Sequence, residues 1–133
     1  MTMQLLRISL GALAGAAFAF AAFPAAAHHG WGGNVDQVSE MTGVVVSPVS
    51  LSGPHGTMKI KTADGKTWDI TLAPPFRTSS AGLKQDTLKV GDMVTVHGNR
   101  NRDANRYEMK TVQVDYQGKH FMVYPEREAT LHR

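Results

Sequence analysis

The sequence contains no cysteine among its 133 residues. It therefore has no disulfide, no thiolate nucleophile and no Cys-based zinc or iron–sulfur site, and its stability must come from packing. Charge is also scarce: 14 Lys and Arg against 11 Asp and Glu leave a formal net charge of +3. So small an excess does not indicate a nucleic-acid partner or an anionic membrane surface.

Recognisable catalytic motifs are missing as well. There is no G-x-S-x-G nucleophile elbow, no H-E-x-x-H and no phosphate-binding glycine loop. The acidic residues stand mainly at the expected turns and element ends, so no pair of them predicts acid–base chemistry. The sequence predicts that the protein is not an enzyme, with no catalytic residue.

The longest hydrophobic run is too short for a membrane span. It covers sixteen residues, Ile8–Phe23, where a helix needs about 20 to cross a bilayer. Arg7 precedes the run and Ala25–Ala27 follow it, which is the order of a secretory signal peptide. We expect cleavage after Ala27 and a periplasmic or secreted protein, without a stable membrane span. An uncleaved membrane anchor is the alternative.

The chain after Ala27 divides into three predicted parts. Cleavage would leave 106 residues with 13 basic and 11 acidic side chains, a net charge of +2. Residues 28–40 are polar and glycine-rich, which predicts a flexible leader that Trp31 could staple to the domain. Residues 41–124 form the predicted β-barrel domain. Residues 125–133 are charged and predict a frayed tail.

Period-two alternation dominates the predicted domain. It predicts strands over residues 41–49, 57–62, 67–72, 93–97, 107–116 and 120–124. Only Phe76–Lys89 lacks it, so we expect at most one short helix. Six short strands with frequent turns predict an all-β fold, a small five- to six-stranded Greek-key barrel of the OB type. A minimal sandwich is the alternative. Alternation also places Trp68, Met58 and Met109 in the core.

Several short motifs occur in a recognisable order along the chain. They are His28-His29-Gly30-Trp31, Met41-Thr42-Gly43-Val44-Val45, Gly53-Pro54-His55, Gly65-Lys66-Thr67-Trp68, Gly82-Leu83 and Gly91-Asp92-Met93-Val94-Thr95-Val96. In this the chain resembles an uncharacterised family of small secreted bacterial proteins. The resemblance implies a fold and a compartment but no activity. Gly53 departs from the family's usual Asn, and His97 from its usual acidic or polar residue.

Histidines at the predicted mature N-terminus suggest a copper site. The α-amine of His28, with the amide and imidazole of His29, would give copper(II) the nitrogen ligands that it favours in a tetragonal plane. Alternatively, the amine and imidazole of His28 would bind the ion together with His55. Imidazole and α-amine protons are lost near pH ~6.5 and ~7.7–8.0, so a metal ion can displace them around neutral pH. In the alternative interpretation, these histidines belong to a mobile leader that binds no metal ion.

Two further residues are weaker candidates for the metal site. Met93 and His97 share one face of a predicted strand, and thioethers suit copper(I). The architecture is also similar to small periplasmic barrels that bind copper or silver through His, Met and Trp. The predicted partner is a metal ion or an envelope protein, and no nucleic acid. The alternative function is a metal-free envelope interaction or ligand-binding module.

Overall fold

The structure, a computed structural model, describes residues 30–132. The predicted signal peptide and the candidate ligands His28 and His29 lie outside these residues. Along the chain come β1 (Asn34–Ser50), β2 (Thr57–Thr62), β3 (Thr67–Thr71), the helix α2 (Pro75–Ser80), β4 (Met93–Asn101), β5 (Glu108–Tyr116), β6 (Lys119–Met122) and the 3-10 helix η1 (Pro125–His132). No helix among them is long and apolar enough to span a membrane.

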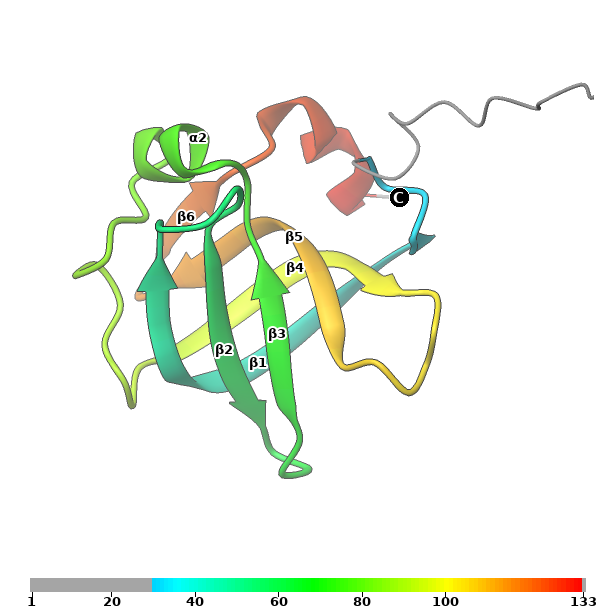
Figure 1. Cartoon of the computed structure of the whole chain (residues 1–133), viewed down its shortest axis with the longest axis horizontal. Helices are drawn as coiled ribbons and strands as arrows, with labels where there is room; N and C mark the ends of the chain where they lie inside the picture. Colours follow the sequence, from blue (N-terminus) through cyan, green and yellow to red (C-terminus); the bar gives the residue numbers. More distant parts are fainter. Residues whose placement is uncertain (1–29, 133) are drawn as a thin grey trace, which may run out of the picture.

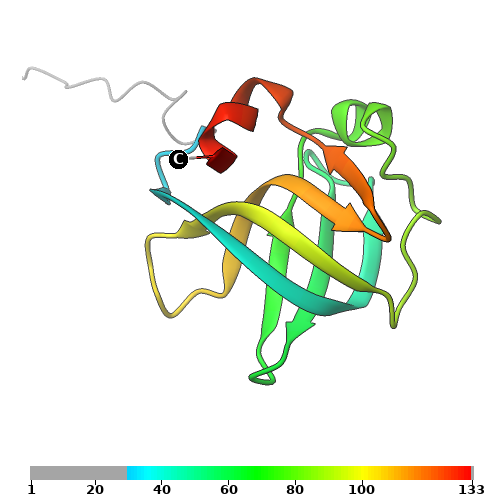
Figure 2. The same cartoon turned by 180° about the vertical axis from the view of Figure 1, so that it is seen from behind.

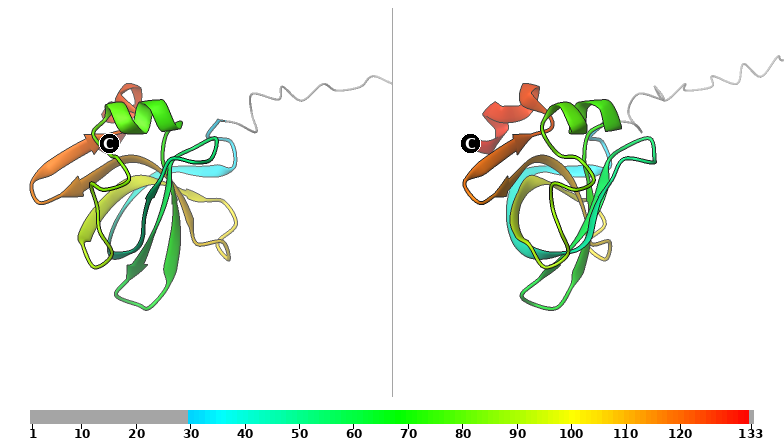
Figure 3. Two further views of the ribbon diagram at one scale, coloured as in Figure 1. Left: turned by 60° about the vertical axis from the view of Figure 1, so that its left-hand side comes forward. Right: turned by 90° about the vertical axis from the view of Figure 1, so that its left-hand side faces the viewer.

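Five strands close into a ring, which the right-hand view of Figure 3 shows nearly end-on. The sheet order is β3-β2-β1-β4-β5-β6, and a parallel pairing of β3 with β5 completes the ring. The pairing of β1 with β2 shifts register on either side of Ser47, and such bulges bend a strand. The predicted all-β, OB-like fold with one short α-helix is confirmed.

Alternating apolar side chains fill the ring. Ile60, Ile70 and Val96 are at most 1% exposed, and the predicted core residues Met58, Trp68 and Met109 are at most 5% exposed. The helix α2 lies across one end of the ring (Figure 1). It begins directly after Pro74, and its buried Thr78 donates a hydrogen bond of 2.7 Å from Oγ1 to the carbonyl of Ala73. The helix thereby covers that end of the core.

The first strand begins earlier than the sequence predicts. Residues 34–40, expected in the leader, form the start of β1 and pair with the end of β4, which itself runs on to Asn101 rather than ending at residue 97. No residue of β1 before Gly43 is fully buried, so this half carries no apolar alternation to reveal it. Its partner contributes instead a buried polar side chain, Asn99, which donates to two main-chain carbonyls of β1.

The C-terminal residues also differ from expectation. Residues 125–132, predicted to fray, form η1, which lies beside the start of the described chain (Figure 2). The guanidinium of Arg127 stacks on Trp31, and Glu126 forms an ion pair with Arg77 of α2. The prediction of a frayed tail misses these contacts, because the partners are aromatic and basic groups far away in the sequence.

Candidate functional site

His55 lies in the turn between β1 and β2, and the main chain around it is held firmly. The amide of Gly56 donates to the carbonyl of Ala73 at 2.8 Å, and the amide of Leu72 donates to the carbonyl of Gly56 at 2.7 Å. A Cβ on Gly56 would lie 3.0 Å from the Thr78 hydroxyl, so only glycine fits comfortably there. This packing leaves the imidazole of His55 half-buried at the edge of the ring.

A cavity of about 190 Å³, the His55 cavity, opens beside this turn. It lies where β3 meets β5, and its lining comes from the start of the described chain, from the turn after β1 and from four strands: Gly30, Asn34, His55, Thr71, Asn101, Glu108, Met109 and Lys110. Gly30 directly follows His29 in the sequence. The cavity is thus lined by His55, one of the predicted metal ligands, and by Gly30, the neighbour in sequence of another predicted ligand, His29.

The polar groups of the His55 cavity have defined partners. Asn101 donates from Nδ2 to Oε2 of Glu108 at 2.9 Å, and an Arg106 guanidinium nitrogen lies 3.2 Å from the other carboxylate oxygen. Lys110 donates from Nζ to the carbonyl of Gly30 at 3.0 Å. Burial, and then the charge of Arg127, lower the pKa of Lys110. Met109 is fully buried, so its thioether faces the core.

Trp31 attaches the N-terminal segment to the barrel, as the sequence predicts. Its indole meets the Tyr124 ring edge-on with centroids 5.1 Å apart, and Lys110 Nζ lies 4.5 Å from the indole centroid. Arg127 stacks at 3.9 Å. We call these residues the N-terminal clamp: Gly30, Trp31, Lys110, Tyr124 and Arg127.

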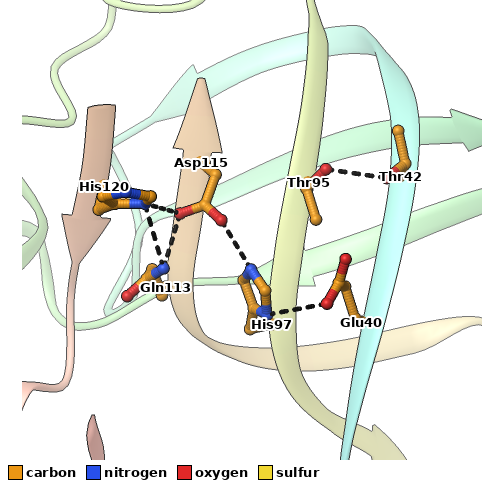
Figure 4. Close-up of polar contacts among 7 residues, drawn as sticks. All are labelled: Glu40, Thr42, Thr95, His97, Gln113, Asp115 and His120. Atoms are coloured by element: carbon orange, nitrogen blue, oxygen red, sulfur yellow. Dashed lines mark hydrogen bonds and ion pairs between the residues drawn. The ribbon is translucent and has the colours of Figure 1, made fainter. Parts of the chain in front are cut away.

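A second polar cluster lies on the outer face of the sheet (Figure 4). Four neighbouring strands each contribute one titratable side chain, and we call Glu40, His97, Asp115 and His120 the histidine–carboxylate row. His97 Nε2 and His120 Nδ1 each lie 2.7 Å from a different oxygen of Asp115, so each ring donates an N–H to that carboxylate. Glu40 is 3.8 Å from the other nitrogen of His97.

The hydrogen bonds of the row set the protonation of Asp115. Burial raises the pKa of this carboxyl, but hydrogen bonds from His120, His97 and Gln113 outweigh burial and lower the pKa below its usual range. The side chain of His97 is 18% exposed, so most of its surface is covered. In the sequence, only the alternation of the strand indicates that His97 lies on the face opposite Val94 and Val96.

Met93 and His97 do not meet. They share the outer face of β4, opposite Val44 and Glu40 of β1, but four residues along a strand span about 13 Å at ~3.3 Å each. Met93 lines a separate apolar cavity with Val46 and Ala63. The structure therefore does not bring these two side chains together at one cavity.

Across residues 30–132, no group of three or more His, Asp or Glu side chains is placed to hold a metal ion. The described residues therefore do not form a complete metal centre by themselves.

Comparison with known families identifies the chain. The sequence model of DUF6152, described as a family of unknown function, matches residues 16–110. The chain belongs to this family. Membership of DUF6152 confirms the resemblance to an uncharacterised family and brings no activity with it. No curated protein matches this DUF6152 member.

Solved structures resemble this DUF6152 member in fold. A ZRD-deleted mutant of TiaS in complex with agmatine aligns with TM-score 0.50 and 14% identity over 65% of this chain and 26% of that chain. A chain of the S. pombe Stn1–Ten1 complex aligns with TM-score 0.49 and 12% identity over 62% of this chain and 60% of that one. The chain spans only about a fifth to a quarter of the TiaS chains it matches. At these identities the likeness concerns the fold alone.

Proposed function

We propose that this DUF6152 protein is an exported, periplasmic copper-binding module that uses His28, His29 and His55. The observation that carries the proposal is that Gly30 and His55 line one cavity. Successive Cα atoms are about 3.8 Å apart, so the covalent chain brings His29 next to a residue already fixed at that cavity.

The chemistry of the cavity favours copper(II) over copper(I). The described residues offer it imidazole from His55 and oxygen from Glu108, whereas the thioether of Met109 is fully buried. Met93 lines a different cavity. Copper(II) prefers nitrogen and oxygen ligands in a tetragonal plane, and copper(I) prefers soft sulfur. An α-amine and imidazoles from the N-terminus would complete a nitrogen-rich set with His55.

The position of the cavity also supports a ligand-binding role. In OB-type barrels, ligands commonly bind over strands 2 and 3 between the loop that joins strands 1 and 2 and the loop that joins strands 4 and 5. Here His55 stands in the first of those loops, and Asn101 and Glu108 flank the second.

The test is a copper(II) titration of protein matured in a bacterial periplasm and read by electron paramagnetic resonance. Intact mass would verify that the chain begins at His28. We expect a one-to-one signal with couplings to several nitrogens. The double variant His28→Ala/His29→Ala should lose this signal, and His55→Ala should lose one nitrogen coupling.

The matched control is His132→Ala, because His132 is an exposed histidine in η1, which does not line the His55 cavity. It should bind copper like the parent. Absence of one-to-one binding by correctly processed protein would contradict the proposal. The alternative, a metal-free interaction module, would then be favoured, because a second and mainly apolar cavity of about 480 Å³ lies beside the exposed Met93.

A further inference from the structure

The cavity of about 480 Å³ beside Met93, which we call the Met93 cavity, lies on the outside of the barrel. Its apolar walls come from Val44 and Val46 of β1, from Ala63 in the turn after β2 and from Met93 at the start of β4. Strand pairing places Val44 directly opposite Met93 on one side and Lys61 on the other. The hairpin of β2 and β3 projects beyond the ring (Figure 1), and its turn contributes one wall of the cavity.

The apolar side chains of the Met93 cavity are open to solvent. Met93 is 62% exposed and Val46 is 38% exposed. Single exposed apolar side chains are common on protein surfaces, but apolar side chains gathered around one hollow indicate a binding site. Ligand pockets typically measure about 300–1,000 Å³ and are mainly apolar with a few polar groups. The Met93 cavity has this size and this kind of lining, whereas the His55 cavity is smaller.

Three polar side chains complete the lining of the Met93 cavity, and two of them already have partners. Thr42 Oγ1 lies 2.8 Å from Thr95 Oγ1, and Thr62 Oγ1 donates to a carboxylate oxygen of Asp64. The third, Lys61, is exposed, and no ion pair among residues 30–132 includes it. Its ammonium is therefore the group of this cavity that suits an anion.

An apolar hollow with one cation at its rim has the chemistry of a site for an amphiphile. An alkyl tail would bury the exposed surface of Val46 and Met93, and methionine adapts to a flexible tail because its unbranched side chain has three rotatable bonds. A carboxylate head group would accept charge-assisted hydrogen bonds from the Lys61 ammonium. A nucleic acid would need several cations, because each phosphate contact requires one.

We propose that the Met93 cavity binds the tail of a single-chain fatty carboxylate and that Lys61 binds its head group. This inference goes beyond the proposed copper function, because the Met93 cavity and the His55 cavity share no lining residue.

The first experiment measures the affinity for dodecanoate, below its micelle concentration, by isothermal titration calorimetry. Burial of one methylene contributes about 0.8 kcal/mol, so decanoate should bind about 15-fold more weakly than dodecanoate. Met93→Asp and Val46→Asp each place a charge against the tail and should weaken binding by at least about tenfold. Phe76→Asp is the control, because Phe76 is more exposed than either residue and lines a different cavity. It should bind like the parent.

The role of Lys61 is tested by changing the charge on each side of the contact. Lys61→Met should weaken dodecanoate binding about fivefold at low salt and less at high salt, because the pair is exposed. The same variant should bind the uncharged 1-dodecanol like the parent. Lys119→Met removes an exposed lysine of β6 that does not line the cavity and should change neither affinity.

A second measurement locates the ligand. In protein with isotope-labelled methionine methyl groups, dodecanoate should shift the nuclear magnetic resonance of Met93 and leave those of the buried Met58 and Met109 in place. No saturable binding by the parent, or equal binding by the parent and both aspartate variants, would overturn the proposal.

Analytical ultracentrifugation without ligand tests the competing occupant, a second copy of this chain. A dimer of the parent that Met93→Asp dissociates would assign the cavity to a protein interface and would also overturn the fatty carboxylate site. The parent is expected to sediment as the same species as Met93→Asp. Copper binding should be unchanged in Met93→Asp and Val46→Asp, so this proposal and the proposed function succeed or fail separately.

Discussion

The side-chain amide of Asn99 donates a hydrogen bond of 3.0 Å to the carbonyl oxygen of Val35, 64 residues earlier in the chain. A second bond of 3.1 Å goes to the carbonyl of Asp36. Both carbonyls lie in the register shift of β1 between Asn34 and Val38, where the regular ladder is interrupted. The side chain of β4 thus replaces main-chain hydrogen bonds that the strand pairing cannot supply.

Removal of this amide should destabilise the protein. Asn99 is 1% exposed, and stranding buried hydrogen-bond partners costs about 1–3 kcal/mol. We expect Asn99→Ala to lower the free energy of unfolding by ~2 kcal/mol, measured by urea denaturation. Asn105→Ala, in the exposed loop after β4, should change it by less than about 0.5 kcal/mol. Equal stabilities for the two variants would contradict this role of Asn99.

The lowered pKa of Asp115 predicts that the free energy of unfolding depends on pH in the acid range. Its pKa in the folded protein is lowered from an ordinary value of 3.8. The carboxylate therefore stabilises the fold fully above its unfolded pKa, and this contribution is lost as pH falls through the lower, folded pKa. Asp115→Asn should be less stable than the parent at pH 6, and the difference should shrink below pH ~4.

The measurement for Asp115 is chemical denaturation followed by circular dichroism at several pH values. Asp86→Asn, which removes an exposed carboxylate from the loop after α2, is the matched control and should follow the parent throughout. A stability difference for Asp115→Asn that stays constant down to pH 2 would rule out the linkage.

Gly98 should tolerate no side chain. A Cβ there would lie 2.2 Å from the carbonyl oxygen of Lys110 and 2.8 Å from the Cα of Thr111, because β4 and β5 approach closely at the register shift after His97. Both obstacles are main-chain atoms, so Gly98→Ala should lower the free energy of unfolding by about 3 kcal/mol or more. At Gly33 a Cβ meets nothing within 4 Å. Gly33→Ala should therefore have a near-parental melting temperature, and similar melting temperatures for both variants would refute the argument.

Leu83 tests whether the segment after α2 belongs to the core. Its side chain is fully buried, whereas Phe76 in α2 is 82% exposed. Leu83→Ala should cost about 2–5 kcal/mol, the usual range for a cavity left in a packed interior. Phe76→Ala should cost less than about 0.5 kcal/mol. Thermal unfolding of the two variants compares them directly, and a Leu83→Ala protein as stable as Phe76→Ala would exclude the segment from the core.

Local patterns were enough to predict the fold. Met58, Ile60, Trp68 and Ile70 alternate in two segments joined by Asp64-Gly65, and they pair as the hairpin of β2 and β3. The pattern failed where both faces of a strand are partly exposed, as in residues 34–40. Polar composition there reports exposure and not the absence of a strand.

The candidate site was only partly predictable. His120 faces Asp115 because the turn at Gln117-Gly118 fixes the register of β5 and β6, and that signal is present in the sequence. The contact between His97 and Asp115 depends on a bulge with no local signal. Lys110, Gly30 and His55 meet only because the ring closes, and no short-range pattern specifies which residues will line its edge.

The parallel seam between β3 and β5 is short: its three residue pairs are Asp69–Glu108, Ile70–Met109 and Thr71–Lys110. Four of these six residues, Thr71, Glu108, Met109 and Lys110, also line the His55 cavity. Parallel pairing is slightly weaker per residue than antiparallel pairing. We therefore expect the barrel to open transiently at this seam before it opens elsewhere. A ligand that binds the cavity only when the seam is closed would stabilise the closed barrel. At a concentration of 100 times its Kd, it would raise the free energy of opening the seam by about 2.7 kcal/mol. Opening of the seam between β3 and β5 and release of the ligand would then be one coupled step.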